Sequence, residues 1–293
     1  FKAKGRPYDN PLIVHIAEKK DLEKLALQVP FKALKLAKAF WPGPLTIVLK
    51  KSSLVPCEVT CGLNTVAIRM PSHKIARALI KASGVPIAAP SANLSGKPSP
   101  TIAKHVIQDL KGRVEAIIDG GNATIGLEST VIDLTSNPPT LLRPGGITRE
   151  EIEEILGPIK LHSSLKGKLF SLKAKAKSPG MKYRHYSPKA KIFLVEGEPE
   201  KVRAKIAGLA LKFKKKGKIV GVLYCSKKSP YSADSLKFAG SSHKEIARNL
   251  FKKFRAFDRE GIQIIIAEGI SEEGLGLAIM NRMKRASYRI VKA

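Results

Sequence analysis

The fold of the second half of the chain is indicated by residues 191–224, which read KIFLVEGEPEKVRAKIAGLALKFKKKGKIVGVLY. It opens with an apolar run, continues with apolar residues at helical spacing over 199–215, and closes with a second apolar run. Short apolar runs rich in Ile and Val are typical of buried strands. The stretch therefore predicts two parallel strands joined by a helix in a right-handed crossover.

The same alternation continues toward the carboxyl terminus. We predict a helix over 242–257, a strand over IQIIIAEG at 262–269, and a helix over 276–286. Three such units in a row indicate a parallel, Rossmann-like α/β sheet. The first strand leads into LVEGEPE, whose acids would repel a phosphate and which has no phosphate-binding glycine pattern, so we expect no nucleotide site there.

The first half is less regular. Its predicted strands are LIVHIA, LTIVLK, TVAIRM, VPIAAP, EAIIDGG and TVIDL, and its predicted helices cover 20–29, 31–40, 73–83, 101–111 and 148–156. Thr101 and Thr148 are the expected N-caps, the second with Glu151 in a capping box. Unequal spacing of these elements favours a mixed α/β sheet. We expect domains at 1–160 and 191–293, with a basic linker at 161–190.

Composition narrows the class of protein. The 293 residues are 43% hydrophobic, enough for two cores, and no apolar run approaches the roughly 18 residues that span a bilayer. Three cysteines are too few for a disulfide scaffold, and the lone C-x3-C has no partner pair to complete a zinc site. The formal net charge of +29 suggests contact with polyanions, although lysine-rich surfaces are also typical of proteins from hot environments.

Cations and small polar residues gather in four motifs of the first half. Lys4-Gly-Arg6-Pro7 could bind one anion or form a solvated basic turn, and His15 could be a ligand or a core histidine. Ser91 to Ser99 follow a buried strand, where they could bind a ligand or close a turn. Arg69 and Arg143 lie in or after apolar strands, and a buried arginine needs an anion or several acceptors. An anionic ligand is therefore expected.

Known catalytic signatures are absent from the sequence. It contains no P-loop, no G-x-G-x-x-G, no H-E-x-x-H and no G-x-S-x-G. Nucleotide binding would have to use cations and hydroxyls, and covalent catalysis is not indicated.

Seven motifs in order carry a family resemblance. They are KGRPYDNPLIVHI, WPGPLTIVL, VAIRMP, IAAPSANLSGKPSPT, ESTVID, LLRPG and SPGMKYRHYSP. Together they resemble the YrdC-like enzymes, in the long, two-domain form of the L-threonylcarbamoyladenylate synthases. The resemblance implies a YrdC-like mixed, twisted sheet followed by a smaller Rossmann-like domain. It also implies that the strand before Phe1, with a P-T-E-T-x-Y-G-L type segment of the threonine pocket, precedes the sequence.

The resemblance further implies an activity. Such a nucleotidyltransferase makes threonylcarbamoyl-AMP and pyrophosphate from L-threonine, bicarbonate and ATP with Mg²⁺. The product serves tRNA processing, in which a downstream transfer complex modifies adenosine 37 of tRNA. We accordingly expect a cytoplasmic protein with no membrane partner, which could also contact tRNA weakly. The alternative is a non-catalytic RNA-binding module on the same fold, which the net charge suggests.

Matching the family's motifs position by position implies the site residues. The catalytic signatures K-x-R and S-x-N fall on Lys4, Arg6, Ser91 and Asn93. The implied ATP contacts are Arg6, Asn10, Thr65, Ser91, Ser99, Arg143, His185 and Tyr186. The implied threonine contacts are His15, Arg69, Ala89 and Ser129. No protein metal ligand is implied.

The motif SPGMKYRHYSP at 178–188 lies in the basic linker, where residues 160–191 contain nine Lys, one Arg and no acid. In this family the linker folds over the catalytic cavity, so Lys182, Tyr183 and Arg184 would form a lid over the nucleotide. The alternative is a tether whose tyrosines pack on either domain.

Overall fold

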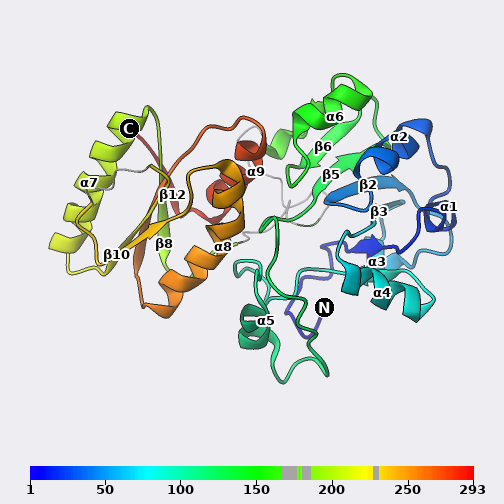
Figure 1. Cartoon of the computed structure of the whole chain (residues 1–293), viewed down its shortest axis with the longest axis horizontal. Helices are drawn as coiled ribbons and strands as arrows, with labels where there is room; N and C mark the ends of the chain where they lie inside the picture. Colours follow the sequence, from blue (N-terminus) through cyan, green and yellow to red (C-terminus); the bar gives the residue numbers. More distant parts are fainter. Residues whose placement is uncertain (166–176, 178, 180–185, 227–230) are drawn as a thin grey trace. The chain divides into compact units, whose positions relative to one another are not determined.

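The computed structural model describes residues 1–165, 177, 179, 186–226 and 231–293. Its internal contacts divide the chain into two compact units (Figure 1). The first unit comprises Phe1–Ser91 and Glu128–Tyr183, and the second comprises Ala92–Leu127 and Arg184–Ala293. The segment Ala92–Leu127 thus clusters with the carboxyl-terminal part of the chain, while the predicted boundaries at 160 and 191 remain a prediction.

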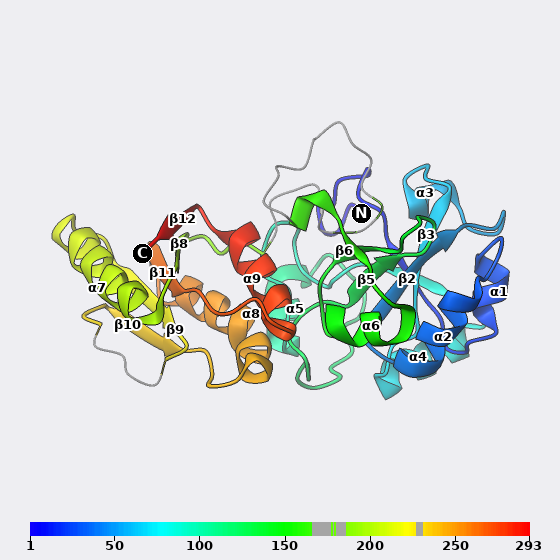
Figure 2. The same ribbon diagram turned by 90° about the horizontal axis from the view of Figure 1, so that it is seen from above.

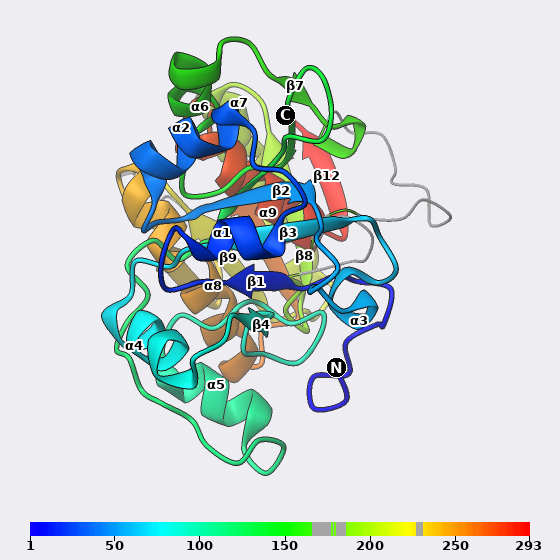
Figure 3. The same cartoon turned by 90° about the vertical axis from the view of Figure 1, so that its right-hand side faces the viewer.

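The first unit contains a mixed sheet of seven strands in the order β4-β1-β3-β2-β5-β6-β7. Their bounds are Ile13–His15 (β1), Leu45–Lys50 (β2), Thr65–Arg69 (β3), Ile87–Ala89 (β4), Thr130–Asp133 (β5), Thr140–Arg143 (β6) and Lys160–Leu161 (β7). Strands β1 and β3 are parallel, whereas β2 and β3 are antiparallel, which confirms the mixed sheet. Figure 3 shows β2, β3, β1 and β4 following one another across this sheet.

The helices of the first unit are short. They are Asp21–Leu25 (α1), Phe31–Phe40 (α2), Cys57–Thr60 (α3), Lys74–Ser83 (α4) and Arg149–Leu156 (α6), with a 3-10 turn at Ser163–Leu165. The predicted capping box of α6 is confirmed: the Glu151 amide donates to Thr148 Oγ1 at 3.2 Å, and the Thr148 amide donates to Glu151 Oε2 at 2.7 Å. These two bonds satisfy amides that have no partner inside the helix.

The second unit contains a five-stranded sheet in the order β10-β9-β11-β8-β12, parallel throughout. Its strands are Lys191–Glu196 (β8), Val220–Tyr224 (β9), Ser235–Phe238 (β10), Ile264–Glu268 (β11) and Arg289–Lys292 (β12). Its helices are Ala103–Leu110 (α5), Pro199–Lys215 (α7), His243–Arg259 (α8) and Leu275–Ala286 (α9). The Rossmann-like sheet predicted from residues 191–224 is thereby confirmed.

Helices cover both faces of the second sheet, with α7 on one face and α8 and α9 on the other (Figures 1 and 2). Alternate residues of each strand therefore enter different cores. Ile192 and Leu194 pack in the core with α8 and α9, whereas Phe193 and Val195 pack in the core with α7. A strand buried on both faces is an uninterrupted apolar run, which is why KIFLVE was recognisable from sequence.

Two local predictions were wrong. Residues 115–121 form no strand; most of them are exposed, and Asp119 Oδ1 instead accepts the Gly121 amide at 2.8 Å in a turn. Helix α5 begins one residue later than expected, so its N-cap is Ile102 and not Thr101. Among the described residues no helix has the length and apolar character needed to cross a membrane.

Candidate active site

One face of the first sheet carries polar residues in a row that crosses five strands. The register pairs His15 with Arg69, Arg69 with Thr46, Thr46 with Val131, and Val131 with Arg143. Paired residues of adjacent strands project from the same face, so these side chains form one line over β1, β3, β2, β5 and β6, in which Val131 is the apolar member and the β5–β6 register shifts after it. We call His15, Arg69, Thr46 and Arg143, with Ser129 beside them, the polar row.

Two arginines of the polar row repel one another. Burial, and after it the charge of Arg143, lower the pKa of Arg69 to about 10. Arg69 Nε donates to the Gly43 carbonyl at 3.0 Å, and Arg69 forms no ion pair with an acid of the described residues. Two cations near each other, one half-buried and one buried, disfavour one another, so this face favours a negatively charged ligand.

Ser129 and Thr46 link the row to Arg143. Arg143 is 7% exposed; its Nε donates to the Ser129 carbonyl at 3.0 Å, and its Nη2 donates to Ser129 Oγ at 3.1 Å. The Ser129 and Thr46 hydroxyls are 2.7 Å apart. Both hydroxyls are buried, so this chain of bonds fixes their direction and presents defined donors and acceptors to a ligand.

His15 lies at the opposite end of the polar row. Burial, and after it the positive charge of Arg69, lower the pKa of His15 to about 4, and bonds to the Ile87 and Ile13 backbone offset only part of this. The imidazole is therefore neutral near pH 7 and can exchange one hydrogen bond as donor and one as acceptor. Ala89 of β4 pairs with Ile13 of β1. Its small side chain leaves space for a ligand on the face that carries His15.

The basic turn of the first unit is closed on itself. Arg6 Nε donates to the Asn10 carbonyl at 3.0 Å and Nη2 to the Pro11 carbonyl at 2.6 Å, and both Arg6 and Asn10 are buried. Lys4 is 8% exposed, and its ammonium donates to the carbonyl of Ser91. The turn thus lies against the end of the strand that leads into the S-x-N motif, bringing Lys4 and Ser91 together.

Thr65 begins β3, four residues before Arg69 on the same face of the strand. It lines a hollow of the first unit together with Lys50, Lys51, Ser52 and Asn64. Its hydroxyl is buried without a hydrogen-bond partner among the described residues. The structure thus places Thr65 on the sheet face of the polar row, although nearer the other end of β3.

The S-x-N motif crosses from one unit to the other, because Ser91 belongs to the first and Asn93 to the second. Asn93 is 4% exposed, and its amide nitrogen donates to the Leu94 carbonyl at 2.8 Å and the Lys97 carbonyl at 3.1 Å. Asn93 therefore shapes the loop that ends at Ser99, which is itself 9% exposed.

Of the predicted linker contacts, the structure describes Tyr186. Its ring is 6% exposed, stacks on Phe251 with centroids 5.3 Å apart, and lies under the Arg282 guanidinium at 5.4 Å. Tyr186 adopts a φ of 66°, in the left-handed region. It therefore belongs to the core of the second unit in this structure. Lys182, Tyr183, Arg184 and His185 lie outside the described residues.

Carboxylates are scarce around these groups. Within the described ranges no cluster of three His, Cys, Asp or Glu side chains could hold a metal ion. The polar row offers guanidinium groups and hydroxyls, which suit phosphate and carboxylate groups and do not suit a resident Mg²⁺.

Sequence reasoning did not identify Thr46. Its hydroxyl belongs to the polar row, yet in LTIVLK a threonine is indistinguishable from a residue chosen for strand propensity. Only its pairing with Arg69 and its contact with Ser129 reveal it.

Comparisons with known proteins agree with this geometry. Residues 1–145 match the family model Sua5_yciO_yrdC, described as telomere recombination, and residues 147–287 match that of the threonylcarbamoyl-AMP synthase C-terminal domain. The threonylcarbamoyl-AMP synthase of Pyrococcus abyssi is 57% identical over 293 residues, which are 100% of this chain and 84% of that protein. The threonylcarbamoyl-AMP synthase of Bacillus subtilis is 50% identical over 298 residues, with the same coverage of 100% and 84%.

A solved structure matches equally well. The crystal structure of P. abyssi Sua5 complexed with L-threonine has a TM-score of 0.95 and 57% identity, and the match covers 100% of this chain and 85% of that chain. Because both parts of the chain match and its relatives align over its whole length, the chain belongs to the threonylcarbamoyl-AMP synthase family of ATP-using enzymes that make an adenylate.

Proposed function

We propose that the chain condenses L-threonine, bicarbonate and ATP into threonylcarbamoyl-AMP and pyrophosphate, and that the polar row is where the anionic groups react. The observation that carries this proposal is the pair of neighbouring arginines on one face of the first sheet, half-buried Arg69 and buried Arg143. The 57% identical P. abyssi protein was solved with L-threonine, which supports threonine as the amino acid bound here.

Threonine would bind at the Arg69 end of the row. Its carboxylate fits the Arg69 guanidinium, which can pair with both oxygens. The hydroxyl of Ser129 and the neutral imidazole of His15 would complete the contacts, and Ala89 would leave space for the side chain. These groups recognise a small zwitterion with one hydroxyl without supplying a nucleophile.

The reaction then needs alignment more than covalent chemistry. The threonine amine and bicarbonate form a carbamate with loss of water. A carbamate oxygen attacks the α-phosphorus of ATP, a new P–O bond forms, and the bond to the β-phosphate bridging oxygen breaks to release pyrophosphate. Cations that hold the three phosphates and the carbamate close together lower the barrier by positioning and by stabilising the developing charge.

The proposed ATP contacts distribute over several motifs. Arg143 would face the phosphates, and Lys4 would lie by the triphosphate and the carbamate. The remaining contacts are Arg6, Asn10, Thr65, Ser91, Ser99, His185 and Tyr186. Mg²⁺ would arrive as part of MgATP, bound chiefly by phosphate oxygens, since this metal often retains waters and few protein ligands.

We also propose that the product passes to a tRNA-modifying complex in the cytoplasm, where adenosine 37 receives the threonylcarbamoyl group. The net charge of +29 supports a weak direct contact with tRNA phosphates. The sequence 178–188 is proposed as the lid that excludes water, because carbamates and mixed anhydrides hydrolyse readily.

Pyrophosphate release tests the function directly. The protein is incubated with ATP, threonine and ¹³C-bicarbonate, and the adenylate is analysed by mass spectrometry. We expect pyrophosphate only when all three substrates are present, with the label in the product. Threonyl-adenylate without the extra carbon would mean ordinary amino-acid activation. RNA binding without pyrophosphate release would favour the non-catalytic RNA-binding module.

A further inference from the structure

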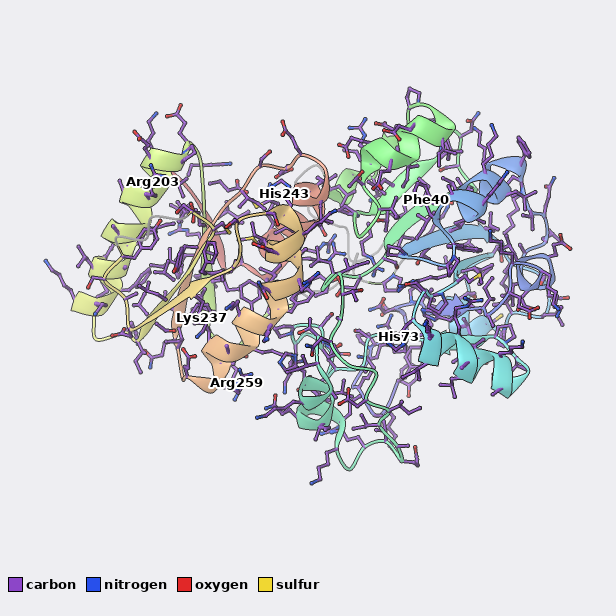
Figure 4. The ribbon with its side chains drawn as sticks, viewed as in Figure 1. Phe40, His73, Arg203, Lys237, His243 and Arg259 are labelled. Carbon is purple, nitrogen blue, oxygen red and sulfur yellow. The ribbon has the colours of Figure 1, made fainter. Side chains whose placement is uncertain are left out.

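Helix α8 of the second unit holds the loop that follows the S-x-N motif. Figure 4 marks the two ends of α8 with His243 and Arg259, and Arg255 lies one turn before the second end. Arg255 is 6% exposed. Its Nε and Nη2 donate to the Pro98 carbonyl at 3.1 and 2.6 Å, one residue before Ser99.

The same guanidinium binds Asp109 on α5. Arg255 Nη2 donates to Asp109 Oδ2 at 2.7 Å, and Nη1 lies 3.4 Å from Oδ1. Burial alone would raise the pKa of Asp109, but the bonds from Arg255 and Lys97 outweigh it and lower the pKa. The carboxylate is therefore charged at neutral pH, and this buried pair is fully bonded.

Asp109 in turn reaches the start of the loop. Its oxygens accept the Leu94 amide at 3.3 Å and the Lys97 ammonium at 3.0 Å. One carboxylate thus fixes residues 94 and 97, while its partner Arg255 fixes residue 98. Together with the Asn93 side chain, these bonds determine the course of the backbone from Asn93 to Ser99.

Further contacts anchor the rest of Ala92–Leu127 along the same helix. Arg248 Nε donates to the Thr124 carbonyl at 3.1 Å. Gly126 has a φ of 82°, and a Cβ there would lie 2.4 Å from the Ala247 carbonyl oxygen, so the two backbones touch. Leu127 packs on the core that contains α8. The segment is therefore held on α8 from Ala247 to Arg255 and does not hang as a free loop.

We propose that Arg255 and Asp109 are positioning residues for the nucleotide, which hold residues 94–99 in the conformation that binds ATP. This inference rests on the proposed function, because the resemblance assigns Ser99 to the ATP site and Asn93 to the catalytic signature. It makes α8, which lies more than a hundred residues later in the sequence, part of the apparatus that sets ATP affinity. Threonine recognition, which is proposed on the first sheet, should not depend on it.

The test compares Asp109→Asn, Arg255→Lys, Arg255→Met and the double variant Arg255→Met with Asp109→Asn. Arg259→Met is the matched control, because it removes the same charge from an exposed position of the same helix. Calorimetry without threonine gives the ATP affinity, steady-state assays give KM and kcat, and hydrogen exchange of the amides of residues 94–97 and 99 reports the loop in the ligand-free protein. Asp109→Asn keeps the size of the side chain, so the test does not depend on Arg255→Met folding.

We expect Asp109→Asn and Arg255→Met to weaken ATP binding at least about tenfold and to accelerate exchange over 94–99, because each breaks the buried ion pair and leaves the remaining charge with fewer partners. KM for ATP should rise by the same factor, while KM for threonine changes less than about twofold. The double variant should exchange more slowly than Arg255→Met, and Arg255→Lys should recover part of the affinity. Arg259→Met should match the wild type.

Two results would overturn the proposal. Unchanged exchange in Asp109→Asn would mean that the pair does not hold the loop. Faster exchange with unchanged ATP affinity would mean that the loop is held but does not position the nucleotide. Failure of the proposed function would give a different result, namely wild-type protein that releases no pyrophosphate. The ATP affinities of the wild type and the variants can be compared by calorimetry in that case too.

Discussion

In the first sheet one face carries arginine, histidine and hydroxyl side chains on neighbouring strands, whereas the central strands of the second sheet send apolar side chains to both faces. In the described part of β8 and β11, the buried interior positions read IFLV and IIIA. The polar residues of β8 and β11 lie at strand ends, where Glu268 accepts the Cys225 amide at 2.6 Å.

Removing side chains from water has opposite energetic consequences in the two sheets. Apolar side chains gain free energy on leaving water, so the second sheet contributes stability on both faces. Arginines that leave water lose hydration, and a like charge nearby adds to that cost, so the polar row contributes less stability than an apolar row would. Substitutions in the second sheet should therefore change stability alone, while substitutions in the polar row should chiefly change ligand binding.

The largest change in the free energy of unfolding is expected from Ile206→Ala on α7, which removes a side chain from the apolar core of the second unit. Ile206 is fully buried in the core between α7 and the second sheet. Removing most of its side chain should lower the free energy of unfolding by about 2–5 kcal/mol. Chemical denaturation measures this loss. Leu211→Ala on the same helix is the control, since Leu211 is 51% exposed and should change stability by less than about 0.5 kcal/mol.

Affinities of Ile206→Ala for ATP and threonine, measured well below its melting temperature, should equal those of the wild type. A folded Ile206→Ala protein with weakened threonine binding would contradict this prediction, because the core of the second sheet would then contribute to more than stability.

A smaller change in free energy, but a larger change in function, is expected from Arg69→Met. Losing one charge-assisted contact should weaken threonine binding about 10–100-fold, or roughly 1.5–3 kcal/mol. Stability should change by less than about 1 kcal/mol, because the lost bond to Gly43 is offset by relief of repulsion from Arg143. Calorimetric titration with threonine and denaturation of the same samples measure both quantities.

Arg149→Met is the matched control for Arg69→Met. Arg149 pairs with Glu153 on α6 and belongs to no strand of the sheet, and its loss should leave threonine affinity unchanged. If Arg69→Met binds threonine normally but unfolds readily, Arg69 is a structural residue and the functional reading of the row is wrong.

The second sheet was easier to predict than the first because its signal is local. An apolar run buried on both faces looks the same in any context, so β8, β9 and β11 were predicted from their own residues. The edge strands β10 and β12 were missed, since SLKF and RIVK are short and partly charged. The run at 115–121 was overpredicted, because apolar residues such as Ile117 and Ile118 mark a strand only if a neighbouring strand pairs with them.

The sequence predicted the site residues whose charge is unusual for an apolar strand. It did not predict residues whose role depends on a partner far away in the sequence. Arg69 and Arg143 could be predicted as site residues because arginines rarely occupy apolar strands. Arg255 did not, since its partner Asp109 is 146 residues away in sequence. A basic amphipathic helix such as α8 gives no sign of which of its cations is buried, so tertiary structure was needed to find the pair.

The smallest effect is expected from Thr46→Val, which tests whether the polar row extends to a residue that the sequence did not reveal. Valine keeps the shape of threonine and removes only the hydroxyl that lies 2.7 Å from Ser129 Oγ. Ser129 would keep its bond from Arg143 at 3.1 Å, so stability should fall by only about 0.5–1.5 kcal/mol. Threonine binding should weaken by up to about tenfold, because the Ser129 hydroxyl would lose one of the two bonds that fix its direction. Thr46→Ser restores the hydroxyl and should bind as the wild type does, which separates the hydrogen bond from packing. Equal threonine affinity in Thr46→Val and wild type, measured by calorimetry, would mean that Thr46 does not contribute to ligand binding and serves only as a residue of β2.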